Sequence, residues 1–248
     1  MRVVLGVLIT LIAMTASSTA QDGADRERAR LHNRLGWESM RAEAWPEAAK
    51  YFQQAIDLDP TYEYAYYGLG RANMAMKKYP AAIAVLERCR ELYRAQAGRQ
   101  FANAQEAQRY RRDRILEIDE QIRQVQSMPQ SMRTADLLRQ LQNVRREEQD
   151  RIERGNNMTI DTSVPAFVSI SLGSAYFRTG KLADAEREYK AAVASDPKSG
   201  EAHSNLAVVY LETGRYADAE KSVKAAEKAG FRVHPQLKDE IKKRRSGT

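Results

Sequence analysis

The sequence holds few of the residues from which enzyme and metal sites are usually built. It has one cysteine, Cys89, so no disulfide can form within the chain. The three histidines, His32, His203 and His234, lack the spacing that metal ligation requires. No phosphate-binding loop is present, and no nucleophile, base and orienting group form a recognisable set. We therefore expect no catalytic activity, no metal and no cofactor.

An excess of one charge and long β-branched runs are also missing. The 248 residues include 40 Lys and Arg and 33 Asp and Glu, giving a net charge of +7 that is spread along the chain. A binder of single-stranded nucleic acid interleaves aromatic and basic residues, and that pattern is absent here. The lack of β-branched runs disfavours a sheet. The composition predicts an all-α protein without a nucleic-acid partner.

What the sequence does contain is an internal repeat with a period of 34 residues. The segment Gly180–Glu186 recurs as Gly214–Glu220, and Leu35–Gly36 recurs as Leu69–Gly70. Small residues at fixed positions let helix axes approach closely, and bulky residues at other fixed positions fill the space between them. This pattern is typical of stacked helix pairs.

These segments resemble the tetratricopeptide repeat family over residues 29–94 and 166–231, which gives two repeats before and two after a long insert. The resemblance implies an all-α solenoid of helix-turn-helix units. It also implies a noncatalytic scaffold or adaptor that binds a protein or peptide partner in its groove. Residues 234–245 predict a further helix that caps the last repeat, with Leu237 and Ile241 toward the stack.

Glycine and proline mark the expected helix ends. Gly180 and Gly214 tolerate a left-handed cap after a first helix, and Pro46 and Pro80 suit the first turn of a second helix. Arg94 stands where the family usually has a proline. We therefore expect the second helix of repeat two to continue into the insert.

Residues 95–163, the insert and its linker, predict an antiparallel coiled-coil hairpin. Apolar residues in the first arm are spaced by three and four, as in a coiled-coil seam, and Pro129 separates this arm from a second one over residues 132–154 that includes Leu141 and Val144. Arms of about 25 residues would project about 35–40 Å and let repeats two and three stack. Arg111 and Glu148 interrupt the apolar seam. These charged side chains must be exposed to solvent, form an ion pair across the two arms, or be covered by another part of a protein. The apolar seam residues are Ile115, Ile118, Ile122 and Val125.

The candidate partner-binding surface is the inner face of the first helices, where an apolar segment is a better fit than a free acidic tail. Aromatic side chains are common anchors because they bury a large area at low entropic cost, although some will pack between repeats instead. We expect Trp37, Tyr64, Tyr67 and Phe177 to be the anchors. The candidate partner-binding residues on this face are Trp37, Met40, Tyr64, Tyr67, Arg71, Met74, Phe167, Ile170 and Phe177.

Two alternative functions remain open at this stage. The chain is an envelope structural or assembly factor if the hairpin mediates a homo-oligomer, and an accessory subunit of an enzyme system if another chain supplies the chemistry. Residues 1–20 predict a signal peptide, with a positive start, an apolar core and small residues at Ser18 and Ala20. Retention of this segment as a membrane anchor is the minority interpretation, because about 20 apolar residues are needed to span a bilayer. We expect an exported protein, periplasmic if bacterial and otherwise secreted, with no membrane span after cleavage.

The first prediction is that export removes residues 1–20, so that the mature protein begins at Gln21. Mass spectrometry of the amino-terminal peptide of the native protein checks this. An intact Met1 on membrane-embedded protein would contradict both the cleavage and the predicted location.

Overall fold

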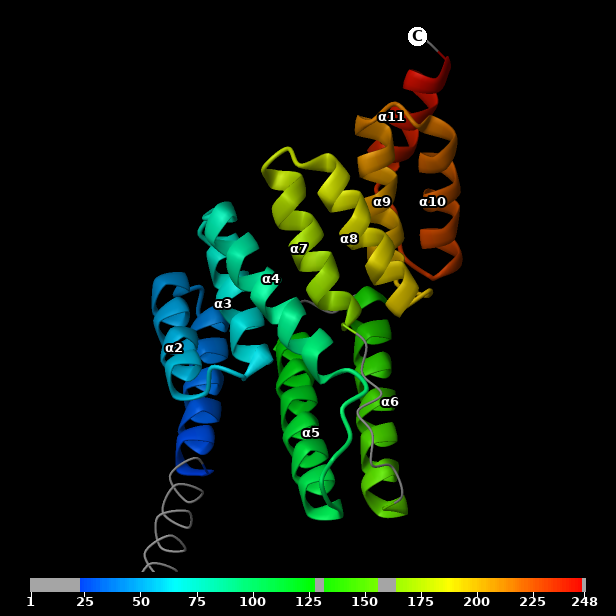
Figure 1. Ribbon diagram of the computed structural model, residues 1–248. Coiled ribbons are helices and arrows are strands. Elements are labelled where there is room, and N and C mark those ends of the chain that lie inside the picture. The colour runs from blue at the N-terminus through cyan, green and yellow to red at the C-terminus, as the bar shows by residue number, and fades with distance from the viewer. Residues whose placement is uncertain (1–22, 128–131, 156–163, 247–248) are drawn as a thin grey trace, which may run out of the picture.

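The computed structural model describes residues 23–127, 132–155 and 164–246, and most of these residues are helical (Figure 1). The predicted signal peptide and Pro129 lie outside the described residues. The first described helix covers residues 23–41. The helices that follow are α2 (Trp45–Leu58), α3 (Glu63–Ala75), α4 (Tyr79–Gln96), α5 (Ala104–Ser127), α6 (Met132–Arg154), α7 (Ala166–Arg178), α8 (Leu182–Ser195), α9 (Gly200–Glu212), α10 (Tyr216–Lys228) and α11 (Pro235–Ser246).

The helices form four successive pairs, which confirms the predicted all-α solenoid. Helix 23–41 packs on α2, α3 on α4, α7 on α8 and α9 on α10, and each pair contacts the next. Close approach is possible because the first helices of repeats one to three carry glycine where a second helix crosses, and that of repeat four carries Ala207. A Cβ on Gly173 would lie 2.8 Å from the Tyr189 ring, and one on Gly70 would lie 2.5 Å from Leu86. One hydrophobic core extends from Ala29 to Ile241.

Repeats two and three stack although about seventy residues separate them in the sequence. Helix α7 packs on α4 and touches α3. The Phe167 ring meets the Tyr67 ring edge to face at 4.6 Å. Arg90 of α4 pairs with the buried Glu188 of α8, and the Tyr176 hydroxyl donates a hydrogen bond to Glu87. The insert therefore leaves and re-enters the solenoid without interrupting its core.

The turn inside each repeat is the same hydrogen-bonded cap. The residue just before each second helix donates a backbone hydrogen bond to the carbonyl oxygen of the residue five positions earlier, at 2.8 to 3.0 Å. The pairs are Ala44 to Ser39, Lys78 to Asn73, Lys181 to Tyr176 and Arg215 to Tyr210. The residue that precedes each of these donors has a positive φ. Repeats three and four have Gly180 and Gly214 there, as expected, whereas repeats one and two have Glu43 and Lys77, at 57° and 60°.

Helix α4 is longer than the second helices of the other repeats, as Arg94 predicted. It has 18 residues, whereas α2 and α8 have 14 and α10 has 13. The extra turn, residues 93–96, begins with Tyr93, which is buried. The extension therefore supplies packing surface for the first half of the insert.

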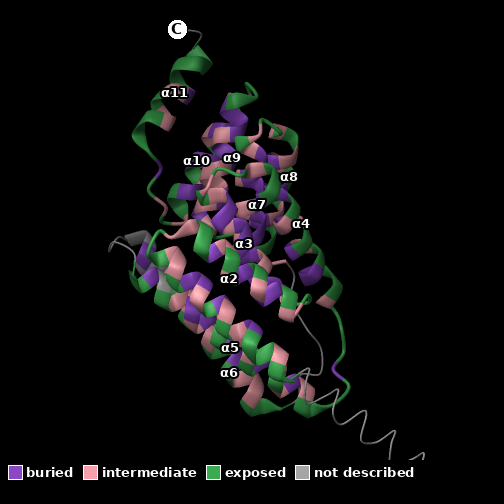
Figure 2. Ribbon diagram, turned by 90° about the vertical axis from the view of Figure 1, so that its left-hand side faces the viewer, coloured by how far each residue is buried: buried purple, intermediate pink, exposed green. Residues whose placement is uncertain are grey.

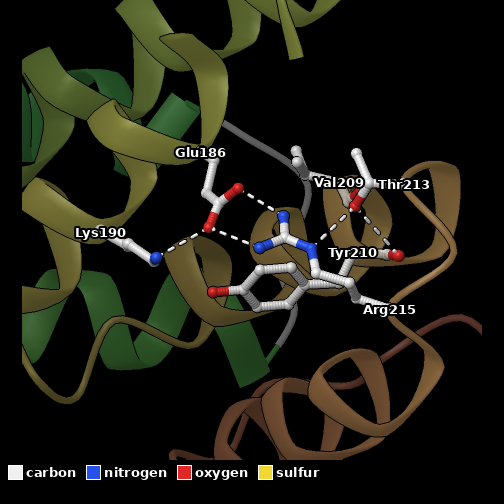
Figure 3. A network of polar contacts seen from close by, with 6 residues as sticks. All are labelled: Glu186, Lys190, Val209, Tyr210, Thr213 and Arg215. Carbon is white, nitrogen blue, oxygen red and sulfur yellow. Dashed lines mark hydrogen bonds and ion pairs between the residues drawn. The ribbon is translucent and has the colours of Figure 1, made fainter. Parts of the chain in front are cut away.

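An ion-pair network joins repeats three and four (Figure 3). Arg215 binds both carboxylate oxygens of Glu186 and lies over the Tyr210 ring, with its guanidinium carbon 4.4 Å from the ring centroid. Lys190 also binds Glu186, at 2.7 Å. Hydrogen bonds from Arg215 lower the pKa of Glu186 to about 2. In the repeat register Glu220 corresponds to Glu186, and Glu220 pairs with Arg245 of α11.

Helices α5 and α6 pack against each other as an antiparallel pair, so the insert is a helical hairpin. Asp119 pairs with Arg145 at 2.6 Å, and the buried Arg111 lies 3.9 Å from the buried Glu148. The polar seam position is thus filled by a cross-arm ion pair. Val144 is wrong as a seam residue, because its side chain is 40% exposed. Of the four seam residues predicted in the first arm, Ile115, Ile118 and Val125 are buried and Ile122 is half-buried.

The hairpin does not project freely from the solenoid, contrary to the expectation from its length. Ion pairs Arg30–Asp113 and Arg41–Glu120 hold α5 against helix 23–41. Figure 2 shows exposed residues along much of α5 and α6, and buried residues gathered in the repeat stack. Among the described helices, none is long and apolar enough to cross a bilayer.

The second prediction concerns the strained turn of repeat two. Lys77→Gly should raise the free energy of unfolding by about 0.5–1 kcal/mol, because glycine adopts a positive φ without a Cβ clash. Chemical denaturation of both proteins measures the difference. The matched control is Gly214→Lys, which should lower stability in the corresponding turn of repeat four. Equal stability of Lys77→Gly and the wild type would show that this φ costs nothing.

Candidate functional site

The inner face of the first helices gathers the predicted aromatic residues into one cluster. The Trp37 ring centroid lies 5.5 Å from that of Tyr64 and 5.9 Å from that of Tyr67. Tyr64 stacks on Tyr67 at 5.8 Å, and Tyr67 meets Phe167 of repeat three. Helical spacing brings these rings together, because each lies on the same face of its own helix. The cluster runs across three repeats.

Most of this cluster is buried, so the expectation that it lines an open groove is corrected. Trp37 is 2% exposed, Tyr64 is fully buried and Tyr67 is 6% exposed. Part of the reason is packing between repeats, since Trp37 also meets the Phe52 ring edge to face at 5.0 Å. In this conformation these three side chains cannot contact another molecule. Whether they bind a partner when uncovered stays a prediction.

Helix α5 is the second reason for the burial. It runs parallel to helix 23–41, since Arg30 pairs with Asp113 and, farther along both helices, Arg41 pairs with Glu120 at 2.8 Å. Trp37 lies between these two arginines on the same helix. Burial raises the pKa of Tyr64 most, and the charges of Tyr67, Glu117 and Glu120 raise it further. Carboxylates of α5 therefore lie next to the aromatic cluster.

A buried charged cluster lies where α5 meets repeat two. Arg114 donates to Glu117 at 3.1 Å and to the Tyr93 hydroxyl at 3.3 Å. Glu63, at the start of α3, is buried and accepts a hydrogen bond from Gln96 at 3.2 Å. Burial and the nearby Glu63 raise the pKa of Glu117 to about 8, against the opposing effect of Arg114. Burial also raises the pKa of Glu63. Two carboxyl groups thus share one guanidinium.

The packing of α5 on the repeats leaves space and unpaired polar atoms. A cleft of about 670 Å³ lies between helix 23–41 and α5, with Leu31 and Leu116 among its lining residues. A second cavity, of about 190 Å³, separates the start of α3 from α5 and is lined mostly by charged residues. Within the described chain, three buried polar atoms of this region have no hydrogen-bond partner: Asn33 Oδ1, Trp37 Nε1 and the Tyr64 hydroxyl.

The remaining predicted residues are half-buried and lie on the first helices of repeats one to three. Arg71 donates to the Tyr67 hydroxyl at 2.9 Å, and its guanidinium lies near that ring. Met40, Met74, Phe167 and Phe177 pack on the edge of the core. Ile170 is half-buried on α7, one and two turns before Ser174 and Phe177. This part of the face keeps some exposure.

Sequence reasoning missed the charged residues that hold α5 in place. Arg30 and Arg41 share a helix face with Trp37, at spacings of seven and four residues. Asp113, Glu117 and Glu120 form a stripe on α5 at spacings of four and three. Each pattern was visible in the sequence. Their pairing was not, because it joins segments about eighty residues apart.

Cys89 is buried, as predicted, and its thiol donates a hydrogen bond to the Glu63 carbonyl at 3.2 Å. Burial raises the pKa of this thiol well above its usual value, so the thiolate form that reacts is disfavoured. In the described part of the chain, no three His, Cys, Asp or Glu side chains are arranged to hold a metal ion. The candidate site therefore consists of the aromatic cluster on the first helices and the ion pairs that hold α5 beside it.

Comparison with known proteins gives the same repeat family for both halves. Two family models described as tetratricopeptide repeat match residues 39–106 and 170–230. No curated protein matches the chain. Among solved structures, PilW, a widely conserved type IV pilus biogenesis factor, is 14% identical with a TM-score of 0.40, and the alignment covers 88% of this chain and 86% of PilW.

Two further solved structures are described as tetratricopeptide repeat proteins. TTC0263 of Thermus thermophilus is 19% identical with a TM-score of 0.36, over 88% of this chain and 99% of that protein. YrrB, described as having an unusual peptide-binding site, is 15% identical with a TM-score of 0.29, over 86% of this chain and 90% of YrrB. Likenesses this distant leave the partner of this chain open.

The third prediction is that stability falls as pH rises from about 4.5 to about 8, because folded Glu117 keeps a proton that the unfolded chain releases. The slope from this one group is as much as about 1.4 kcal/mol per pH unit. Glu117→Gln, which mimics the protonated acid, should reduce that slope and be more stable than the wild type near pH 8. The charged groups that shift the pKa of Glu117 are Glu63 of α3 and Arg114 and Asp113 of α5. The charge of Glu117 in turn raises the pKa values of four buried groups: Tyr62, Tyr64, Cys89 and Tyr93.

Denaturation at about pH 5, 6, 7 and 8 measures both slopes. Glu91→Gln is the control, because Glu91 is an exposed acid on α4. An unchanged slope in Glu117→Gln would mean that Glu117 is ionised in the folded protein.

Proposed function

Since the chain belongs to the tetratricopeptide repeat family, which matches slightly more than half of it, we propose that it is a noncatalytic scaffold that binds a partner protein on its first-helix face. Solenoids of this kind present an extended concave surface to their ligands. The observation that carries the proposal is the continuity of that face across the insert. Helix α7 touches both α3 and α9, so the first helices of repeats two to four are neighbours.

The accessible part of this face has the chemistry of a partner site. Met74 of α3 and Ile170 and Phe177 of α7 are half-buried, so each keeps apolar surface in contact with solvent. Methionine and phenylalanine adapt well to an apolar segment of a partner. Arg71, next to Tyr67, adds a cation that can orient a polar group of the ligand. We therefore place the open binding site on α3 and α7.

Self-association is the second candidate function, and one observation favours it. The hairpin carries two large apolar side chains in solvent, Leu116 at 56% and Val144 at 40% exposure. A second copy of the chain that packs on the hairpin would cover them. The mass of the purified protein in solution, measured by light scattering, separates a monomeric scaffold from an assembly factor of this type.

We also infer that the protein acts outside the cytoplasm after export. The inference is supported by the composition of residues 1–20, with a basic start, an apolar core and a small-residue cleavage region. An exported scaffold does not meet proteins of the cytosol. Its partner is therefore expected among proteins of the same compartment.

The fourth prediction tests the open site. Met74→Glu and Phe177→Glu should each weaken capture of the native partner by about thirtyfold, because a lost apolar anchor costs about 2 kcal/mol. The partner is first captured from native cells on the immobilised wild-type protein and identified by mass spectrometry. Its dissociation constant is then measured for each variant.

The matched control is Ala84→Glu, which adds the same acid to an exposed position on α4, a second helix. Thermal melting confirms that all three variants fold. Normal binding by both groove variants, with loss in a hairpin variant such as Arg112→Glu, would place recognition on the hairpin instead.

A further inference from the structure

Helix α5 follows the groove in a definite register. It contacts the inner face of repeat one twice, through Arg30–Asp113 and Arg41–Glu120, and runs in the same direction as helix 23–41. Farther in, Arg114 reaches the Tyr93 hydroxyl and Glu117 lies near Glu63.

The face that α5 turns to the repeats carries three acidic residues and Arg114, and its apolar face is turned away. Asp113, Glu117 and Glu120 act on groups of the repeats, whereas the apolar residues Ile115 and Ile118 follow the seam with α6. In Glu120 the carboxylate is 5% exposed and is held by Arg41 and by Arg123 at 2.6 Å. Charge pairs therefore carry most of the contact between α5 and repeat one.

Charge pairs with voids around them make a contact that can be exchanged. The cleft of about 670 Å³ beside α5 and the unpartnered Trp37 Nε1 and Tyr64 hydroxyl show that α5 does not fill the groove as the repeats fill one another. Buried polar atoms without partners cost free energy, and a ligand that supplied acceptors would recover it. The groove has donors that α5 leaves unused.

We propose that α5 is a built-in occupant of the groove of repeats one and two, and that the external ligand of this groove is a helix with two acidic residues seven positions apart, as Asp113 and Glu120 are on α5. The proposal rests on the proposed scaffold function and adds its regulation. The groove is closed in the free protein. A partner helix with two carboxylates seven residues apart displaces α5, pairs with Arg30 and Arg41 and uncovers Trp37. This ligand is acidic, unlike the apolar segment expected from the sequence.

The groups that line the groove favour an acidic ligand. Two arginines, 11 positions apart on helix 23–41, flank an aromatic floor that contains hydrogen-bond donors at Trp37 and Tyr64. Carboxylates pair with guanidinium groups and accept hydrogen bonds from N–H and O–H donors. Helix α5 is tethered to the groove, so its effective concentration there is in the millimolar range. A free ligand that competes with α5 must therefore bind tightly, bind at several sites, or act on a protein in which the contacts of α5 are weakened.

The fifth prediction is tested first without any partner. In a Trp45→Phe background, Trp37 is the only tryptophan, and its fluorescence reports whether α5 covers it. Glu120→Arg should shift the emission to the red and raise the acrylamide quenching constant about threefold, because a buried tryptophan becomes accessible. The charge-swapped pair Arg41→Glu with Glu120→Arg should restore the wild-type values. Arg112→Glu, at an exposed position on the same helix as Glu120, is the control.

Hydrogen exchange distinguishes opening from unfolding of repeat one. Opening predicts faster exchange in α5 and α6 with unchanged protection in α3 and α4. Equal loss of protection in α3, or a Trp37 that stays shielded in Glu120→Arg, would overturn the proposal.

The ligand chemistry is tested with a synthetic peptide of residues 109–124. It should bind Glu120→Arg saturably, at least about tenfold more tightly than the wild type and than a control peptide in which Asp113 and Glu120 are replaced by the corresponding amides. Equal binding of both peptides would overturn the assignment of an acidic ligand. These readouts involve neither Met74 nor Phe177, so they can fail while the scaffold function stands, and the reverse also holds.

Discussion

The stacking of repeat three on repeat two is the contact on which the rest of the structure depends. Helix α7 lies on α4, the Phe167 ring meets Tyr67, and Arg90 reaches the buried Glu188. A helix pair cannot bury its apolar face alone, so each repeat is stable only with a neighbour. Because this junction forms, both ends of the insert are held close to the first-helix face. The hairpin is thereby confined to the neighbourhood of the groove.

That confinement explains why one surface has two different halves. Over repeats one and two the inner face is covered by α5, and charge pairs such as Arg41–Glu120 replace contact with solvent. Over repeat three, Ile170 and Phe177 of α7 keep partial exposure. A single groove of this kind can hold a permanent apolar contact at one end and an exchangeable charged contact at the other. The chain would then respond to one partner without releasing another.

The local features of the fold were predictable from the sequence, and the long-range ones were not. Gly180 and Gly214 predicted the turns of repeats three and four, and Arg94 predicted the longer α4, because caps and helix length depend on nearby residues. Glu43 and Lys77 gave no signal for their positive φ. Trp37 and Tyr64 were placed on the correct face, but their burial depends on a segment far along the chain. The predicted seam held at Ile115, Ile118 and Val125 and failed at Val144.

The pairing of Glu220 with Arg245 reproduces, at the last repeat, the contact that joins repeats three and four. Between repeats three and four, the acid of one copy binds the arginine of the next, through Glu186 and Arg215. Glu220 is the corresponding acid of the last copy, and α11 gives it the cation that a fifth copy would have supplied. The terminal helix thus imitates the edge of one more repeat. A cation of α11 therefore occupies the place at which the arginine of a neighbouring repeat would pair with this acid.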